Sequence, residues 1–475
     1  MNRFLSILVV LLLVSPVAFC ADTATVLVTV HPDKPGLKIP ADFLGLSYEK
    51  PMLADNHFRP DNSELLNLCR NLGNGVLRFG GNKVETTSWS RNKPFATKPV
   101  SKNAPQIIGP ADLDNLYAFS KQSGWRVIHG LNLGGNQPAM AADEAAYALQ
   151  VGGSSVVAFE VGNEPDYYPK HGLRSTNYPY SQYRSEAEVE QRTILKNSPQ
   201  ASLAGPATTR RCAWFNDFVA DFKGRIALAT SHFYSLSSKS KDPKSPSFAT
   251  VENLLSDRTK QAWITGIGER QKTAHAAGIP FRLGECNSVS DGGTDGVSDA
   301  FASALWGADF LFDVAEQGVA GINFHGGFGN RGYTPLSLRD GHYHPRPLYY
   351  GMLLFQQAAH GRTVPVECQT TANVTVHAVL GDDGKLRVVI INKDLTQAAA
   401  VAVASGLPRT KAEVIFLTAP SVAAKTGVTL AGCAVRADGV WLPPPGGLVV
   451  GVNGRFELSL PAATAAMLTI DEGHR

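Results

Sequence analysis

Short apolar segments alternate with longer, helix-like segments between residues 43 and 326, and this alternation leaves few folds open. Strands that alternate with helices form βα units and a parallel sheet. We predict strands at 43–49, 75–81, 125–133, 156–164, 202–208, 226–234, 280–286 and 320–326. Helices are predicted between most of them, at 62–73, 110–122, 138–151, 181–197, 258–277 and 297–317. Eight strands close a (β/α)8 TIM barrel, so we expect an α/β fold with the barrel over residues 41–360.

The pattern changes after about residue 365. Residues 374–380 and 386–392 are strand-like and flank Gly381-Asp382-Asp383-Gly384, which predicts a β-hairpin. Further short strands follow to Ile470, so residues 361–475 are expected to form an antiparallel β-sandwich. The segment 21–40 holds another strand, at 24–30, and we expect it to pair with this C-terminal domain.

The first 20 residues have the features of a cleaved signal peptide. A positive start at Asn2-Arg3 precedes an apolar stretch over 5–13, and Ala18-Phe19-Cys20 resembles a cleavage site before Ala21. The stretch is too short to span a bilayer. We expect a secreted or periplasmic protein with no membrane insertion after signal removal. Acylation of Cys20 would make a lipoprotein, but the bulky Phe19 disfavours it.

The net charge and the cysteine content limit the possible partners and disulfides. The net charge of +3 over 475 residues does not indicate a nucleic-acid partner, and the basic run 239–244 is expected to be a solvated loop. Five cysteines remain after removal of Cys20, so they cannot all pair, and a Cys368–Cys433 disulfide stays open. No cofactor is indicated, and the oligomeric state is undetermined.

Polar residues stand at the ends of seven predicted strands. These ends carry Tyr48-Glu49, Gly80-Gly81-Asn82, Asn132 to Asn136, Asn163-Glu164, His232-Phe233-Tyr234, Glu285 and His325-Gly326-Gly327. A barrel brings the C-terminal ends of its strands to one rim, so the sequence predicts a pocket there. The long loops 83–108 and 235–257 are candidates for its walls.

Glu164 and Glu285 end the fourth and seventh strands, and two carboxyl groups can cleave a glycosidic bond. One protonates the leaving oxygen while the other attacks the sugar, with the pair about 5–5.5 Å apart in retaining enzymes. We expect these strands to lie nearly opposite each other, so that the tips approach this spacing. Asn163 beside Glu164 offers an amide for a sugar hydroxyl, and proximity of the two acids would raise the pKa of one.

The motifs Asn163-Glu164-Pro165 and Gly284-Glu285 resemble those of the retaining glycoside hydrolases of clan A. Within the clan the chain most resembles family 79, the β-glucuronidase and heparanase group, also through residues 77–82, 159–165 and 232–234 and the C-terminal β-domain. The resemblance implies Glu164 as acid/base and Glu285 as nucleophile of a retaining β-glycosidase that needs no metal. It implies sugar contacts from Asn163, Glu49 and Tyr234. Further expected substrate contacts are Gly81, Asn82, Ser290, Gly292 and Tyr333.

One departure from the family leaves the sugar open. The family commonly has a tyrosine five residues after the nucleophile and a glycine seven after, both contacting the uronic carboxylate. Here Ser290 and Gly292 stand there, with Asp291 between them. An ionised Asp291 facing the sugar would repel a carboxylate, whereas an Asp291 that points to solvent would not. A β-glucuronidase is therefore expected, with a β-glycosidase of neutral, glucoside-type sugars as the alternative.

Two other classes of protein remain open. His129, His232 and His325 lie near strand ends and would bind metal in a metal-dependent barrel hydrolase, although none has HxH or HExxH spacing. A non-catalytic carbohydrate-binding protein on the same fold is the second alternative, because a fold does not guarantee an activity.

Overall fold

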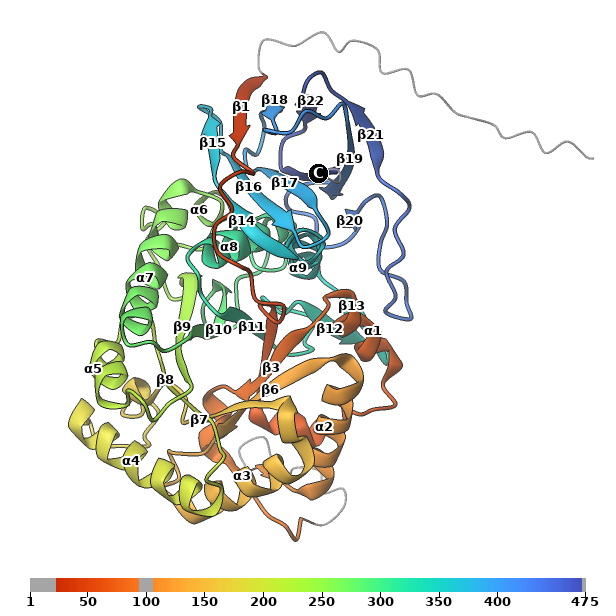
Figure 1. Ribbon diagram of the computed structural model, residues 1–475. Helices are drawn as coiled ribbons and strands as arrows, with labels where there is room; N and C mark the ends of the chain where they lie inside the picture. The colour runs from red at the N-terminus through yellow and green to blue at the C-terminus, as the bar shows by residue number, and fades with distance from the viewer. Residues whose placement is uncertain (1–22, 94–105, 472–475) are drawn as a thin grey trace, which may run out of the picture.

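The computed structural model describes residues 23–93 and 106–471, which form a barrel domain and a β-domain stacked on it (Figure 1). The predicted signal peptide 1–20, with Cys20, lies outside the described residues, as does part of the loop 83–108. Within the described ranges, no helix combines the length and the apolar character that a membrane crossing requires.

The predicted eight-stranded barrel is confirmed. Its strands follow one another in the closed order β2 (Gly45–Glu49), β3 (Gly75–Gly80), β6 (Trp125–Leu131), β7 (Val156–Val161), β8 (Leu203–Thr208), β9 (Leu228–Leu236), β10 (Phe281–Val289) and β11 (Gly321–Gly326). Each strand pairs in parallel with its neighbours. The strands of Glu164 and Glu285 lie nearly opposite each other, as expected, because β8 and β9 separate β7 from β10 and place them three positions apart in the closed ring of eight. Their C-terminal ends therefore share one rim and face each other across it.

Helices cover the outside of the barrel. The predicted ones are α1 (Ser63–Asn71), α2 (Pro110–Ser123), α3 (Pro138–Gly152), α4 (Tyr180–Asn197), α7 (Asp257–Ala276) and α8 (Ala302–Glu316). Three further helices were not predicted: α5 (Trp214–Asp221) and α6 (Val251–Leu254), which are short, and α9 (Pro347–Ala358). Most of α9 is apolar and buried, so it lacks the polar stripe by which an amphipathic helix is recognised.

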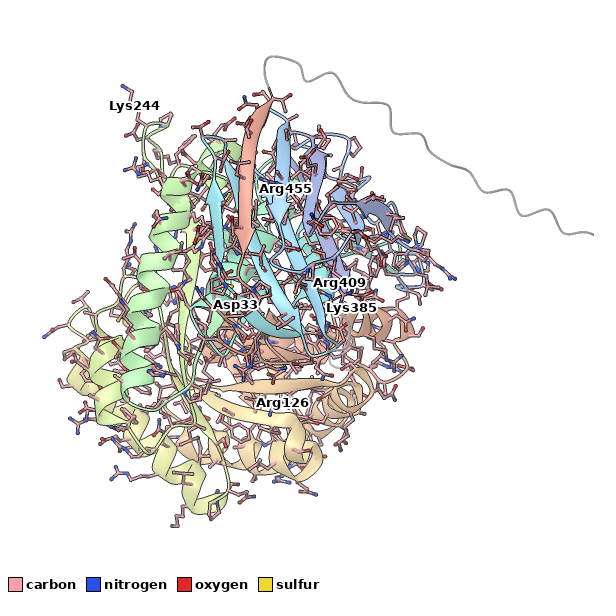
Figure 2. The ribbon with its side chains drawn as sticks, turned by 45° about the horizontal axis from the view of Figure 1, so that its top comes forward. Asp33, Arg126, Lys244, Lys385, Arg409 and Arg455 are labelled. Carbon is pink, nitrogen blue, oxygen red and sulfur yellow. The ribbon has the colours of Figure 1, made fainter. Side chains whose placement is uncertain are left out.

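Short elements connect the barrel strands at the rim. They are the 3₁₀ turns η1 (Lys50–Asp55), η2 (Asn82–Thr86), η3 (Gly153–Ser155) and η4 (Pro165–Tyr167), and the strand pairs β4 (Thr87–Trp89) with β5 (Gln106–Ile108) and β12 (Leu336–Arg339) with β13 (His342–Pro345). The loop after β9 carries Lys244 far out into solvent (Figure 2).

Two sheets form the β-domain. One has the order β15 (Val366–Gln369), β1 (Ala24–Val30), β18 (Ala399–Ala404) and β22 (Arg455–Leu460). The other has the order β14 (Gly361–Val364), β16 (Val374–Gly381), β17 (Lys385–Asn392), β23 (Thr464–Asp471), β19 (Lys411–Thr418) and β20 (Thr429–Leu430), with β21 (Gly447–Val450) beside β19. Buried side chains of both sheets, such as Val28, Val403, Val388 and Leu468, share one core, as expected for a sandwich.

The N-terminal strand β1 lies inside the β-domain, where the red strand of Figure 1 stands beside the blue strand β18. Every second residue of β1 is buried, which suits a strand with one face on the sandwich core. The β1–β18 pair is parallel, unlike the other pairs of its sheet, so the sandwich is not purely antiparallel.

A buried ion network joins the two domains. Asp309 on α8 accepts from Lys393 of the β-domain at 2.8 Å and from Lys260 on α7 at 2.8 Å, and it lies 2.9 Å from His377 Nε2. Burial would lower the pKa of His377, but Glu316 and Asp309 outweigh it and raise the pKa to about 9. The network therefore fixes the β-domain on the barrel through paired charges.

No disulfide forms among the cysteines of the described residues. Cys368 is exposed on β15 and Cys433 follows β20, and both thiols are free. The disulfide that the sequence left open is therefore absent from the β-domain.

Candidate active site

A cavity of about 430 Å³ opens at the C-terminal ends of the barrel strands. Eight of the ten predicted site residues line it: Glu49, Asn82, Glu164, Tyr234, Glu285, Ser290, Gly292 and Tyr333. Its size is in the usual range for small-molecule sites, and its position is where barrel enzymes carry their active sites. We call this cavity the cleft.

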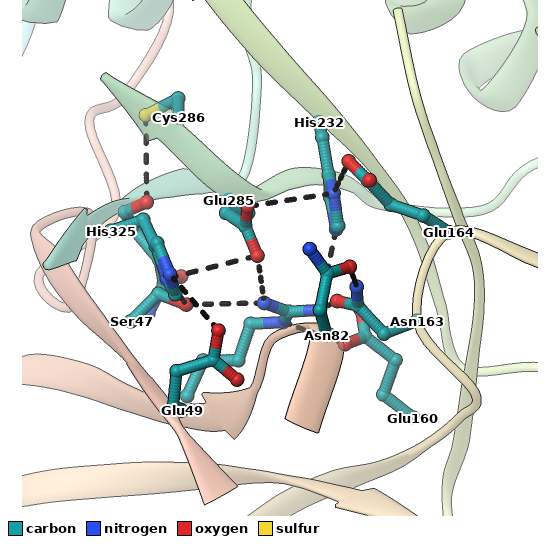
Figure 3. A network of polar contacts seen from close by, with 12 residues as sticks. Ser47, Glu49, Asn82, Glu160, Asn163, Glu164, His232, Glu285, Cys286 and His325 are labelled. Atoms are coloured by element: carbon teal, nitrogen blue, oxygen red, sulfur yellow. Dashed lines mark hydrogen bonds and ion pairs between the residues drawn. The ribbon is translucent and has the colours of Figure 1, made fainter. Parts of the chain in front are cut away.

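Glu285 lies on β10 at the centre of a polar network (Figure 3). The Tyr234 hydroxyl donates to Glu285 Oε1 at 2.8 Å, and Arg78 Nη1 donates to Oε2 at 3.0 Å. Burial alone would raise the pKa of Glu285, but the charges of His325, His232 and Arg78 hold it well below its usual range. Glu285 is therefore kept ionised, as a nucleophile must be.

Glu164 follows β7 in a tight turn, with φ of 45° in the left-handed region. This conformation is unfavourable for a residue other than glycine, so the surroundings must hold it. The backbone N–H of Glu164 donates to Ala207 O at 2.9 Å, and Pro165 begins η4 directly afterwards. The carboxylate is aimed at the cleft, with Oε1 lying 2.8 Å from His232 Nδ1.

The two glutamates meet across the cleft. One carboxylate oxygen of Glu164, one of Glu285 and a ring nitrogen of His232 all lie within 4.8 Å of one another. Figure 3 shows Glu285 flanked by His325 on one side and His232 on the other, with Glu164 beyond His232. This spacing is close to that of retaining glycosidases and too short for the inverting geometry, in which a water stands between the two groups.

Arg78 on β3 is a site residue that sequence analysis missed. The guanidinium is fully buried and also donates to Glu160 Oε2 at 2.6 Å and Asn163 Oδ1 at 2.8 Å. It thus links the nucleophile to the segment that carries Glu164. A signal was present, because Arg78 and Glu160 each interrupt an apolar strand and buried charges need partners.

Two predicted contacts, Asn163 and Gly81, lie behind the cleft wall. The Asn163 side chain is buried, and its amide donates to Asn82 Oδ1 at 3.1 Å. Gly81 has φ of 70°, and a Cβ there would stand 2.4 Å from Glu49 Oε2. The absence of a side chain at Gly81 therefore lets Glu49 approach, while Asn82 and Glu49 face the cleft.

Glu85 on η2 supports the turn that presents Glu164, and it was not predicted. Its Oε1 accepts from the backbone N–H of Asn163 at 2.7 Å and from the Tyr168 hydroxyl at 2.5 Å. Its Oε2 accepts from the backbone N–H of Gly134 at 2.6 Å. Burial raises the pKa of Glu85 although these donors oppose the shift. The carboxylate positions two rim loops without lining the cleft.

The outer wall of the cleft carries three cations that sequence analysis also missed: Arg210, Arg211 and Lys239. Lys239 Nζ lies 2.6 Å from Asp291 Oδ1, and the Ser290 hydroxyl donates to Asp291 Oδ2 at 2.8 Å. Burial would raise the pKa of Asp291, but Lys239 and Ser290 lower it. Asp291 is therefore ionised and paired, so its charge on the cleft wall is largely compensated.

The histidines considered as metal ligands do not form one group. His129 is buried against α3, where its Nε2 lies 2.6 Å from Glu144 Oε1. Two clusters in the described residues have metal-compatible spacing: Glu164 with His232 and Glu285, and Asp309 with Asp313 and His377. Arg78 supplies positive charge to the first, and Lys260 and Lys393 to the second. Both acidic clusters are thus balanced by side-chain cations.

The chain is similar to known glycoside hydrolases. Residues 376–467 match the family description "Glycosyl hydrolase family 79 C-terminal beta domain". A β-glucuronidase of Aspergillus niger is 25% identical over 411 residues, covering 76% of this chain and 73% of that protein. A heparanase of Mus musculus is 24% identical over 387 residues, covering 70% of each. The chain thus carries a C-terminal domain that matches family 79 and is similar over most of its length to a β-glucuronidase and a heparanase.

Solved structures of glycosidases share the fold of this chain. A 4-O-α-L-rhamnosyl-β-D-glucuronidase from Fusarium oxysporum superposes with a TM-score of 0.76 at 20% identity, over 94% of this chain and 100% of that one. An arabinofuranosidase from Xanthomonas axonopodis pv. citri superposes over 94% of this chain and 99% of that one, with a TM-score of 0.70 at 16% identity. At these identities the likeness concerns the fold, and the predicted fold class is confirmed. The protein is a glycoside hydrolase that acts on carbohydrate.

Proposed function

We propose that the chain is a retaining β-glycosidase and that its substrates are β-glucuronides. The observation that carries the proposal is the approach of Glu164 and Glu285 to within 4.8 Å, with Glu285 held ionised. Retention requires a carboxylate near enough to attack the anomeric carbon directly.

The reaction takes two steps. Glu285 attacks the anomeric carbon while Glu164 donates its proton to the glycosidic oxygen, so the aglycone leaves and a glycosyl ester forms on Glu285. Glu164, now a carboxylate, then takes a proton from water, which attacks the same carbon and releases Glu285. The imidazole of His232, 2.8 Å from Glu164, can exchange a proton with it between the steps.

Charge on the cleft wall supports a uronic acid as the glycone. Arg210, Arg211 and Lys239 face the cleft, and Lys239 compensates the charge of Asp291, which would otherwise repel a carboxylate. Relatives from Aspergillus niger and Neurospora crassa are named β-glucuronidases; the second is 27% identical, covering 63% of this chain and 60% of that protein.

A β-glycosidase of neutral sugars is the second candidate. Ser290 stands where the family commonly has a carboxylate-binding tyrosine, and its hydroxyl donates to Asp291. Weaker discrimination for glucuronide over glucoside than the family norm is therefore expected. Comparison of kcat/KM for the two 4-nitrophenyl β-glycosides tests this, and overwhelming preference for the glucuronide would refute it.

Turnover of 4-nitrophenyl β-D-glucuronide by the wild type and by Glu285→Ala tests the mechanism. Release by the wild type above that of the variant also excludes a non-catalytic binding protein. We expect Glu285→Ala to lose about 10³-fold or more in kcat, and azide to restore part of it as the glycosyl azide of inverted configuration. Glu252→Ala, at an exposed position of helix α6, is the matched control and should behave as wild type. Equal release by the wild type and Glu285→Ala would refute the role of Glu285.

We further propose that residues 1–20 direct export and are then removed. The charged start, the apolar stretch and the small residues before Ala21 support this. N-terminal sequencing of the protein recovered from the medium or periplasm should begin at Ala21. Recovery of the intact N-terminus from the cytoplasm would refute it.

A further inference from the structure

A second cavity, of about 570 Å³, lies between the barrel and the β-domain. Four segments form it: the loop after β10, the loop after β11, the β12–β13 hairpin with the start of α9, and a β-domain segment around Lys425. We propose that this cavity is a binding site for an oxyanion, either free or carried by an acidic carbohydrate. The proposal does not depend on the reaction assigned to the cleft.

Arg346 is the main observation. Its side chain lines the cavity, the residue is only 8% exposed, and Nη1 is buried without a hydrogen-bond partner among the described residues. The nearest carboxylate, Asp299, lies 3.5 Å from Nη2. Burying a guanidinium is costly unless its donors are satisfied and its charge is paired. An oxyanion in the cavity would satisfy these donors and pair with the charge, since it accepts hydrogen bonds from several N–H groups at once.

The charge balance around Arg346 also favours a bound anion. Lys425 Nζ lies 2.6 Å from Asp295 and 2.9 Å from Asp299, so one cation already engages both carboxylates of the cavity. Arg331 and Arg339 also line it, and within the described part of the chain neither side chain forms a hydrogen bond or a close ion pair, although the charge of Arg331 helps to lower the pKa of Asp295. Four cations therefore face two carboxylates, which leaves an excess of two positive charges.

The backbone adds to this preference for an anion. Arg346 is the N-cap of α9 and Pro347 its first residue, and both line the cavity. The N-terminal end of a helix carries partial positive charge, which favours an anion nearby. The helix has 12 residues, so its dipole is fully developed at this end.

The cavity is distinct from the cleft but shares two loops with it. Gly292 and Tyr333 line the cleft, while Asp295 and Arg331 line the second cavity, a few residues along the same loops. Tyr333 N–H donates to Gly292 O at 3.2 Å and joins the loops. Because the cleft also contains cations, the test must separate the two sites.

Binding is tested by calorimetric titration of the full chain with sodium sulfate, with potassium phosphate, and with a sulfated uronic-acid disaccharide. Sodium chloride of equal ionic strength is the reference, because it screens charges without offering several acceptor oxygens. Saturable binding absent from chloride supports the proposal. Binding of sulfate or phosphate identifies a free oxyanion. Binding of the disaccharide alone identifies a carbohydrate ligand of this cavity only where Arg339→Gln weakens it, because the cleft is itself proposed to hold a uronic acid, and disaccharide binding that Arg339→Gln leaves unchanged overturns the proposal. A response equal to that of chloride in all arms overturns the proposal.

Variants locate the binding. We expect Arg346→Gln to weaken it about tenfold or more, and Arg339→Gln, an exposed position, about threefold or more. Asp295→Asn should tighten binding, because it frees the charge of Lys425. Lys244→Gln, on an exposed loop outside both cavities, is the control and should leave the affinity unchanged, and Arg211→Gln in the cleft should leave the binding of sulfate and phosphate unchanged. If Arg346→Gln does not fold, the opposite signs of Arg339→Gln and Asp295→Asn decide. Loss of binding in Arg211→Gln, with no change in Arg339→Gln and Asp295→Asn, overturns the assignment to this cavity.

Discussion

Removal of the Tyr234 hydroxyl tests how the barrel keeps the nucleophile ionised. That hydroxyl donates to Glu285 Oε1 at 2.8 Å, and Tyr234→Phe deletes the donor with little change in shape. A hydrogen bond to a charged group contributes about 1.5–3 kcal/mol, and 1.36 kcal/mol corresponds to one pKa unit, so the loss alone would raise the pKa of Glu285 by about 1–2 units. Arg78, His232 and His325 remain and the tyrosine is only part-buried, so we expect about 1 unit.

The pH dependence of kcat/KM, from about pH 3 to pH 8, measures this shift. The nucleophile must be ionised, so activity falls as the pH drops through the pKa of Glu285, which in the wild type is well below its usual range. Raising that pKa makes the fall begin at higher pH. The acidic limb of Tyr234→Phe should therefore lie about 1 pH unit above that of the wild type.

Tyr333→Phe is the matched control. Tyr333 lines the same cleft, and its ring centroid is 5.9 Å from that of Tyr234, but its hydroxyl makes no hydrogen bond to Glu285 among the described contacts. The acidic limb of this variant should stay near that of the wild type. An unchanged limb in Tyr234→Phe, or an equal shift in Tyr333→Phe, would contradict the role given to Tyr234.

Three other substitutions have directional outcomes. Glu164→Ala should lower kcat for a glycoside with a poor leaving group at least about 100-fold more than kcat for a 4-nitrophenyl glycoside, because only the former needs a proton from the acid. An equal loss in kcat on both substrates would count against that role. Glu85→Gln should cost about 1–3 kcal/mol of stability, because an amide cannot accept all three hydrogen bonds. It should affect kcat more strongly than KM. Thermal unfolding and steady-state kinetics measure the two effects, and an unchanged Tm would disprove the role of Glu85. Lys239→Gln should lower kcat/KM for the glucuronide about threefold or more relative to the glucoside, because Asp291 then faces the cleft without its cation. Lys244→Gln on the same loop is the control. Equal effects of Lys239→Gln on both substrates would exclude a role in discrimination.

The barrel and the candidate pair of acids follow from local features of the sequence. A strand buried on both faces must be apolar over its length, so the eight strands stand out, and each ends where polar residues begin. The parallel arrangement then requires that all these ends share one rim. The sequence alone therefore predicts that Glu164 and Glu285 lie on the same rim. It also predicts that a β-domain begins near residue 365.

Tertiary structure alone decided which side chains act on that pair. Whether Arg78 meets Glu285, whether Glu85 holds the turn at Asn163 and whether Lys239 neutralises Asp291 each depend on contacts between segments far apart in sequence. The same holds for the parallel pairing of β1 and β18 and for the unpaired thiols of Cys368 and Cys433. Local periodicity tells which face of an element is buried, but a hydrogen bond or ion pair forms over about 3 Å, and only the closed barrel and its docked β-domain determine which groups come that near.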